Sequence, residues 1–274
     1  MNQRITKAVI PVAGKGTRLK PLTRLLPKEL LPLGCKPVLA FVFDELIAAG
    51  IEESLLIVSP TKTQIEAVFG SEYSGWERET GKSLKLSYAI QLEANGSGDA
   101  VRYAETWTQG ETFLVAFGDC LIETESETPP VLRMIDECQG MGIENAVLVE
   151  KVATEKLSLY GIVAPVEEAE LETGKTAILR DIIEKPKIEE APSHFAIAAR
   201  FLLTSQIFDA LRVSKKDVRG EQNIPDALRL LLNDQIAVGA TPLLKGEVRE
   251  DIGSLEGYYT EFARAVEREK NERV

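Results

Sequence analysis

Short apolar runs alternate with segments of helical periodicity through the first half of the chain. The run KAVIPV, residues Lys7–Val12, predicts a buried strand, and Pro37–Ala49 has the apolar spacing of a helix that ends at Gly50. The same patterns predict strands at Ser54–Val58, Leu84–Ile90, Thr112–Phe117 and Ala146–Val152, and helices at Thr63–Phe69, Gly98–Trp107 and Pro130–Gln139. Continuous apolar strands that alternate with helices predict a Rossmann-like α/β fold, with a mainly parallel sheet covered by helices on both faces.

The pattern changes after residue 152. Three apolar segments, Tyr160–Pro165, Ala177–Ile183 and Ala196–Leu203, are separated by acidic loops and predict a smaller antiparallel excursion from the main sheet. Farther on, Leu228–Leu232 is expected to lie in a helix, and Tyr258–Lys270 to form a terminal amphipathic helix. The sequence contains no internal repeat and no low-complexity linker, so we expect one compact α/β domain with a C-terminal extension.

Composition narrows the possible functions. The 274 residues carry a formal charge of −11, which argues against general binding to nucleic acid or to an anionic membrane. No apolar run approaches the roughly 20 residues that span a bilayer. The N-terminal run leads into a Gly-Lys-Gly loop and not into a cleavage site, so we interpret it as a strand and not as a signal peptide. Cys35, Cys120 and Cys138, an odd number without metal-type spacing, indicate a reducing, cytoplasmic location.

One loop departs from this acidic composition. Glu29 is the only acidic residue between Ala13 and Lys36, a segment that also contains the basic residues Lys15, Arg18, Lys20, Arg24 and Lys28. The loop begins AGKGTR, in which the glycines let backbone N–H groups approach an anion and Arg18 adds a bidentate donor. It is not a Walker A loop, and Leu19 occupies the position of the third glycine of a dinucleotide-binding loop. Gly-x-Gly alone is also compatible with a structural turn.

The longer pattern is more specific. G-K-G-T-R-L followed by P-K-E-L-L-P resembles the signature of the sugar-1-phosphate nucleotidylyltransferases, and other segments of that family follow in order. Gln91 with GSGDAV resembles the base-reading segment, FGD the metal-binding strand end, YGIV and IEKP the sugar segment, and DIG the second metal position. The Lys28–Glu29 pair, the position of Gln91 and the segment GEQN are most similar to bacterial UTP–glucose-1-phosphate uridylyltransferases.

The resemblance implies that a nucleotidyl group passes from a nucleoside triphosphate to a sugar 1-phosphate, with release of pyrophosphate. It implies a catalytic domain over residues 1–240 and an extension over residues 241–274 that completes the metal site and ends in a helix. The antiparallel excursion would then lie on the sugar side. The implied catalytic residues are Arg18, Lys28 and Lys185, the nucleotide-binding residues Ala13, Gly14, Gly16, Thr17, Glu29, Gln91 and Gly96, the sugar-binding residues Gly161, Glu184 and Lys185, and the Mg²⁺ ligands Asp119 and Asp251.

This chemistry agrees with a sequence that offers one histidine and no Ser-His-Asp or Cys-His pairing. A phosphate monoester is already an anionic nucleophile at pH 7, so the reaction needs positioning and positive charge and no covalent residue. The single histidine, His194, lies in an acidic loop and belongs to no triad.

Three positions depart from the uridylyl pattern. Asp99 stands where that branch usually has histidine, Leu255 where it has lysine, and Gly118-Asp119-Cys120 is nearer to the thymidylyl branch. The best prediction is UTP and glucose 1-phosphate as small-molecule substrates, with Mg²⁺ and no nucleic-acid or membrane partner. The alternatives are a thymidylyltransferase or other specificity in the same family, and a non-catalytic protein of this fold that senses nucleotide-sugars. We also expect a homo-oligomer, either a dimer or a tetramer.

Overall fold

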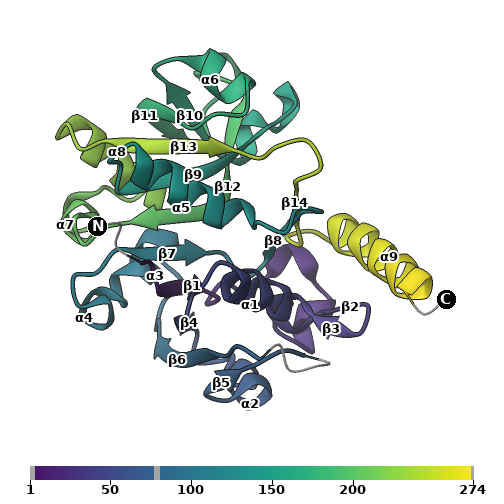
Figure 1. Cartoon of the computed structure of the whole chain (residues 1–274). Helices are drawn as coiled ribbons and strands as arrows, with labels where there is room; N and C mark the ends of the chain where they lie inside the picture. The colour runs from purple at the N-terminus through teal and green to yellow at the C-terminus, as the bar shows by residue number, and fades with distance from the viewer. Residues whose placement is uncertain (1–3, 77–80, 273–274) are drawn as a thin grey trace.

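The apolar segments of the chain assemble into one large sheet. The structure is a computed structural model that describes residues 4–76 and 81–272, without the side chains of 271 and 272. Its main strands are β1 (Lys7–Pro11), β4 (Glu53–Val58), β5 (Glu72–Tyr73), β6 (Leu84–Ile90), β7 (Phe113–Ala116), β9 (Asn145–Lys151), β10 (Gly161–Pro165), β11 (Ala177–Glu184), β12 (Phe195–Leu203) and β13 (Val238–Pro242). Within the described residues they form a ten-stranded sheet in the order β10-β11-β13-β9-β12-β7-β1-β4-β6-β5 (Figure 1).

The half of the sheet that contains β1 is mostly parallel. β1 pairs in parallel with β4 and β7, so that Val9 lies opposite both Leu55 and Val115, and β4 pairs in parallel with β6. Only the two-residue edge strand β5 runs antiparallel to its neighbour there. The predicted strands of this half are confirmed, with ends that shift by one residue at most. The carboxyl ends of β1 and β7 therefore lie side by side, where ligands bind in open α/β sheets.

The other half of the sheet corrects the predicted fold. β12 runs antiparallel between β7 and β9, and β11 runs antiparallel to both β10 and β13, although β9 and β13 are parallel. The whole sheet is mixed and not mainly parallel, and the antiparallel strands belong to it and do not form a separate excursion. β12 is buried along its whole length, so its apolar sequence does not distinguish a parallel from an antiparallel neighbour.

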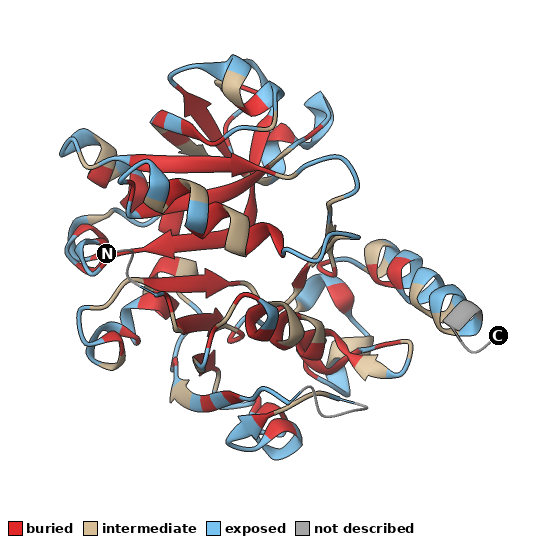
Figure 2. Ribbon diagram, viewed as in Figure 1, coloured by how far each residue is buried: buried red, intermediate tan, exposed pale blue. Residues whose placement is uncertain are grey.

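Helices pack against the sheet through two hydrophobic clusters. Alternate residues of β1 divide between them, because Ala8 and Ile10 lie in one cluster and Val9 in the other. Figure 2 shows the central strands of the sheet buried and the helices exposed on their outer sides. The first cluster includes residues of α1 (Val38–Ala48), α2 (Thr63–Phe69) and α5 (Pro130–Gly140), and the second includes residues of α3 (Ser97–Arg102), α6 (Glu168–Glu172), α7 (Gln206–Val213) and α8 (Ile224–Asn233).

The helix predictions were mostly accurate. α1, α2 and α5 match their predicted ranges within one residue at each end, and α8 contains the predicted Leu228–Leu232. The predicted helix at Gly98–Trp107 is wrong in one respect, because the chain forms α3 and then the separate α4 (Glu105–Thr108). The break follows Arg102, and a single amphipathic pattern across both helices conceals it.

The C-terminal segment connects the sheet to the N-terminal loops. β14 (Val248–Asp251) pairs antiparallel with β8 (Cys120–Glu123), and α9 (Leu255–Glu272) follows and includes the predicted terminal helix. α9 lies beside the hairpin of β2 (Pro32–Leu33) and β3 (Lys36–Pro37), as Figure 1 shows. The predicted domain boundary after residue 240 falls inside β13. The division into a catalytic domain and an extension over residues 241–274 stays a prediction. Residues 1–3 and 273–274 of these predicted ranges lie outside the described part. No helix in that part combines the length and hydropathy needed to span a bilayer.

Candidate active site

The glycine loop follows β1 and places its backbone beside a lysine. Gly16 has a φ of +60°, a left-handed conformation that favours glycine, and Thr23 Oγ1 donates a hydrogen bond of 2.8 Å to its carbonyl. A single 3₁₀ turn, Thr17–Leu19, then carries the exposed Arg18. A Cβ atom at Gly14 would lie 3.7 Å from Lys28 Nζ, so the open backbone of the loop faces the Lys28 ammonium group. This is the arrangement that an anion site requires.

Lys28 forms an ion pair with Asp119, which follows β7. The two side chains are only 15% and 18% exposed. Burial alone would lower the pKa of Lys28, but the charges of Asp119 and Glu29 raise it above its usual value. Burial alone would raise the pKa of Asp119, but the charge and hydrogen bond of Lys28 lower it. Both groups therefore stay charged at neutral pH.

Asp251 lies next to this pair. Its backbone pairs with Cys120 across the β14–β8 ribbon, which brings the two predicted metal ligands to one end of that ribbon. Burial raises the pKa of Asp251, and the charge of Asp119 raises it further. The positive charges of Arg249, Arg18 and Lys28 lower this pKa but do not offset the rise. A Cβ atom at Gly253 would lie 2.6 Å from Asp251 Oδ1 and 2.8 Å from Arg18 Nη2, so these two side chains converge there.

The two carboxylates fit a magnesium ion. Mg²⁺ prefers oxygen ligands and is usually held by one or two carboxylates, water and substrate phosphates. The mutual repulsion that raises the pKa of Asp251 is the kind that a bound cation relieves. Lys28 Nζ donates to Oδ2 of Asp119. Between residues 4 and 76 and between 81 and 272, no group of three or more His, Cys, Asp or Glu side chains forms a candidate metal cluster.

Glu29 is placed differently from its neighbour Lys28. Its carboxylate is fully buried, and Lys62 Nζ donates hydrogen bonds to both carboxylate oxygens at 2.9 and 2.7 Å. Lys62 also donates to the carbonyl of Val12 at 2.6 Å. Burial raises the pKa of Glu29 and lowers that of Lys62. The pair ties the Lys28 segment to the end of β1; Glu29 as a nucleotide ligand stays a prediction.

The predicted base-reading segment forms a tight turn that packs against the backbone of Gln222. Gly96 has a φ of +104°, and a Cβ atom there would lie 2.3 Å from the carbonyl oxygen of Gln222. That carbonyl accepts a hydrogen bond of 2.8 Å from the N–H of Gly98. The Gln91 side chain is buried, and its Nε2 donates to Asp99 Oδ2 at 2.6 Å. Asp99, a departure from the uridylyl pattern, therefore orients the Gln91 amide, and Gln91 as a base-reading residue stays a prediction.

The predicted sugar residues form a second group, at the ends of β10 and β11. Gly161 pairs with Glu184, and a Cβ atom at Gly161 would lie 3.0 Å from Glu184 Oε2. Lys185 has a φ of +46°, so the backbone leaves the strand conformation there. Lys185 Nζ consequently lies 3.0 Å from Glu184 Oε1, although adjacent residues of a regular strand point to opposite faces. Both side chains line an open cavity of about 840 Å³ that is also bounded by residues 213–219 and by α8.

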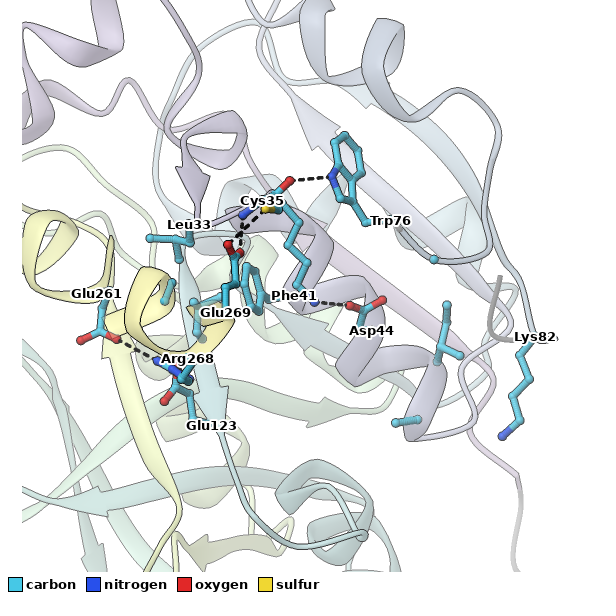
Figure 3. Close-up of a pocket in the computed structure, with 16 residues that line it drawn as sticks. Leu33, Cys35, Phe41, Asp44, Trp76, Lys82, Glu123, Glu261, Arg268 and Glu269 are labelled. Atoms are coloured by element: carbon cyan, nitrogen blue, oxygen red, sulfur yellow. Dashed lines mark hydrogen bonds and ion pairs between the residues drawn. The ribbon is translucent and has the colours of Figure 1, made fainter. Parts of the chain in front are cut away.

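A further cavity lies away from these residues. It has a volume of about 840 Å³ and lies between α1, the β2–β3 hairpin, β8 and α9, and none of the predicted site residues lines it. Figure 3 shows Glu269 of α9 pointing toward Cys35, whose backbone N–H and Sγ donate to it. Trp76 Nε1 donates to the carbonyl of Cys35 at 2.9 Å. These contacts tie α9 and Trp76 to the hairpin.

Sequence analysis did not identify two charged residues near the site. Lys62 precedes α2 and belongs to no motif, and Arg200 lies fully buried in the apolar strand β12. The only signal for Arg200 is a charged residue within a run of buried apolar residues, FAIAARFLL. None of the three cysteines, all in the described part of the chain, forms a disulfide bond. Burial raises the pKa of Cys120 to about 12, which makes that thiol unreactive.

Comparison with known proteins establishes the family of the chain. The chain matches the Nucleotidyl transferase family over residues 7–268. It is 32% identical to the UTP–glucose-1-phosphate uridylyltransferase of Streptococcus pneumoniae, over 94% of this chain and 89% of that one, and 33% identical to that of Streptococcus pyogenes, over 93% and 86%. A crystal structure of UDP-glucose pyrophosphorylase complexed with UDP-glucose is 30% identical and superposes with a TM-score of 0.85, over 96% of this chain and 99% of that one. The predicted family is thereby confirmed: the chain belongs to the nucleotidyl transferase family.

Proposed function

We propose that this protein transfers the uridylyl group of UTP to glucose 1-phosphate and releases pyrophosphate, giving UDP-glucose. The observation that carries the proposal is the convergence of Arg18, Lys28, Asp119 and Asp251 after β1 and β7. Relatives that cover nearly the whole chain bear the name of this activity, and a structural neighbour holds UDP-glucose.

The reaction is a direct in-line displacement. A phosphate oxygen of glucose 1-phosphate attacks the α-phosphorus of UTP, a new P–O bond forms, and the bond to the leaving pyrophosphate breaks. Arg18 and Lys28 offset the negative charge that the two phosphates bring together and that grows on the pyrophosphate. Mg²⁺, held by Asp119 and Asp251 when bound, supplies further charge neutralisation. No proton transfer to a protein base is needed, because the attacking phosphate is already ionised.

Gln91 and the turn at Gly96 would select the base of the nucleotide. Nε2 of Gln91 is bonded to Asp99, so we propose that Oε1 of Gln91 accepts from the N3–H of uracil and that a backbone N–H of the turn donates to O4. Cytosine has the opposite donor and acceptor pattern at these atoms and would leave buried groups unpaired. Thymine differs from uracil only by a methyl group, which is worth about 1–3 kcal/mol of discrimination. The resemblance of Pro27-Lys28-Glu29 to the uridylyltransferases favours uracil, so UTP should be used best, dTTP detectably and CTP poorly.

Glu184 and Lys185 would bind the sugar 1-phosphate. Glu184 accepts hydrogen bonds from sugar hydroxyls, and Lys185 places its ammonium on the phosphate. The left-handed turn at Lys185 supports these roles, because it brings both side chains into the same cavity.

A thymidylyltransferase is the second candidate, and Gly118-Asp119-Cys120 favours it. A matrix of UTP, dTTP and CTP against glucose 1-phosphate and other hexose 1-phosphates, read as pyrophosphate release, separates the candidates. The highest kcat/KM should belong to UTP with glucose 1-phosphate. A higher value for dTTP would favour the second candidate, and no turnover with any pair would favour a nucleotide-sugar sensor. The predicted homo-oligomer and cytoplasmic location stay predictions.

A further inference from the structure

Arg200 is a charged residue in the centre of the molecule. It lies in β12, between β7 and β9, and its side chain is 0% exposed. A buried charge of this kind contributes little to stability when it is paired, because the cost of desolvation offsets the attraction between the charges. Its retention in an apolar strand therefore calls for another explanation.

A β-bulge directs the Arg200 side chain. The register of β12 against β9 shifts between Ile197 and Phe201, and Ala199 inside the shift has a φ of +55°. This conformation is unfavourable for an alanine and persists only where the surrounding structure holds it. Bulges of this type change the direction in which a side chain points.

The bulge and Arg200 hold both ends of the turn that carries Asp119. At one end, the carbonyl of Ala199 accepts a hydrogen bond of 3.2 Å from the N–H of Phe117. At the other end, Arg200 Nη2 donates to the carbonyl of Cys120 at 2.9 Å. The guanidinium is itself fixed by Glu45 of α1, at 3.0 Å from Nε to Oε1 and 2.6 Å from Nη2 to Oε2.

The rest of the turn is equally constrained. A Cβ atom at Gly118 would lie 2.5 Å from Val12 Cγ1, so the turn packs closely on the residue that follows β1. The carbonyl of Asp119 accepts a hydrogen bond of 3.0 Å from the N–H of Ile252, beside Asp251. The main chain on either side of the Asp119 carboxylate is thus held by β12, β1 and the β14 segment, and Arg200 contributes a side-chain hydrogen bond to it.

We propose that Arg200 is a positioning residue that acts through the carbonyl of Cys120 to hold the Asp119 and Asp251 carboxylates in the arrangement that binds a divalent cation. The inference rests on the proposed function, in which these two residues are the Mg²⁺ ligands. Residues that hydrogen-bond to metal ligands and orient them, without contacting the metal, typically weaken metal affinity about 10–100-fold when they are substituted.

The test compares Arg200→Lys with a matched arginine elsewhere. Lysine keeps a positive charge opposite Glu45 but lacks the planar fork that reaches Glu45 and the carbonyl of Cys120 together. Arg133 of α5 is the control, because its Nη2 also joins a carboxylate, Glu247 at 2.7 Å, and a backbone carbonyl, Pro242 at 3.0 Å, away from the site. Mn²⁺ alone is titrated into each full-length protein, and bound ion is measured by electron paramagnetic resonance, with thermal unfolding as the check on folding.

Arg200→Lys should raise the Kd for Mn²⁺ at least about 10-fold, whereas Arg133→Lys should leave it within about two-fold of wild type. An unchanged Kd in folded Arg200→Lys, or an equal loss in Arg133→Lys, would overturn the inference. If Arg200→Lys does not fold, Glu45→Gln replaces it: a several-fold weaker Kd supports the inference and an unchanged Kd overturns it.

Asp119→Asn in the same titration separates this inference from the proposed function. Loss of Mn²⁺ binding in Asp119→Asn together with normal binding in Arg200→Lys removes only the role of Arg200. Normal binding in Asp119→Asn, or none in the wild type, removes the metal site and the inference with it.

Discussion

The charged residues at the site occur as close pairs of opposite sign. Lys28 contacts Asp119, Lys62 contacts Glu29 and Lys185 contacts Glu184. Such pairs fix the side chains before substrate arrives, so little reorganisation is needed when phosphates bind. This explains how an acidic protein of net charge −11 uses a cationic loop: the loop concentrates positive charge where phosphates must approach one another.

The metal role of Asp119 predicts a large effect of a small change. Asp119→Asn keeps the shape of the side chain and removes its negative charge, so turnover should fall by about two orders of magnitude or more while the fold is kept. Steady-state rates over a range of Mg²⁺ concentrations, with circular dichroism for the fold, measure this. Near-normal turnover with unchanged Mg²⁺ dependence would exclude Asp119 from the site.

The proposed division of subsites predicts a selective effect at Lys185. Lys185→Ala should raise the KM for glucose 1-phosphate about 10-fold or more or lower kcat, because a charged hydrogen bond to the phosphate is lost. The affinity for UTP, measured by calorimetry, should be kept. Lys187→Ala is the control, since Lys187 is exposed and pairs with Glu190. Loss of UTP affinity in Lys185→Ala would show that the two subsites were assigned the wrong way round.

Most of the proposed site residues could be predicted because they lie in local sequence motifs. Residues whose partners are distant in the sequence could not. Arg18, Lys28 and Asp119 stand in segments with a recognisable local pattern after apolar strands. Arg200 does not, because its role depends on Glu45, 155 positions away, and on a bulge that the apolar pattern of β12 does not reveal. Lys62 was missed for the same reason, since Glu29 lies 33 positions away.

At the scale of elements, the β8–β14 ribbon was the hardest to predict. Each strand of the ribbon has four residues, and pairing brings together Cys120 and Asp251 from segments far apart in the sequence. Strands this short have too few alternations for a period to be recognised. The long strands and α1, by contrast, were found because their apolar residues follow one period over several turns or alternations.

The contact of α9 with this ribbon predicts a pH-dependent stability. Glu261 of α9 is almost fully buried, and burial together with Glu250 raises its pKa to about 7, although Arg264 opposes the shift. An unfolded glutamate titrates near pH 4.3, roughly. Because the folded pKa is higher, the stabilising contribution is fully present below about pH 4 and is lost as the pH rises through about 7.

Glu261→Gln stays uncharged, so its melting temperature relative to wild type should rise progressively from pH 4 to pH 8. Differential scanning calorimetry at several pH values measures the trend, with Glu267→Gln on the exposed side of α9 as the control. A difference between Glu261→Gln and wild type that does not change with pH would contradict the assigned pKa shift.

At the scale of the whole molecule, one mixed sheet joins two functional halves. The parallel strands β1 and β7 lead into the proposed phosphate residues and Asp119, and β10 and β11 carry the proposed sugar residues. β12 pairs with β7 on one side and β9 on the other, so the two groups share one continuous backbone framework. The parallel half was predictable from alternating strands and helices; the strand order of the other half depends on pairings that no local pattern encodes.

The most direct test of the account is a competition between nucleotides. The wild-type protein is given equal concentrations of UTP and dTTP with limiting glucose 1-phosphate and Mg²⁺, and the nucleotide-sugars are quantified by mass spectrometry. Because the ratio of products equals the ratio of the two kcat/KM values, UDP-glucose should be the main product, with pyrophosphate in equal amount to the total nucleotide-sugar. A majority of dTDP-glucose, or nucleotide-sugar formed without pyrophosphate, would contradict uridylyl transfer by the proposed route.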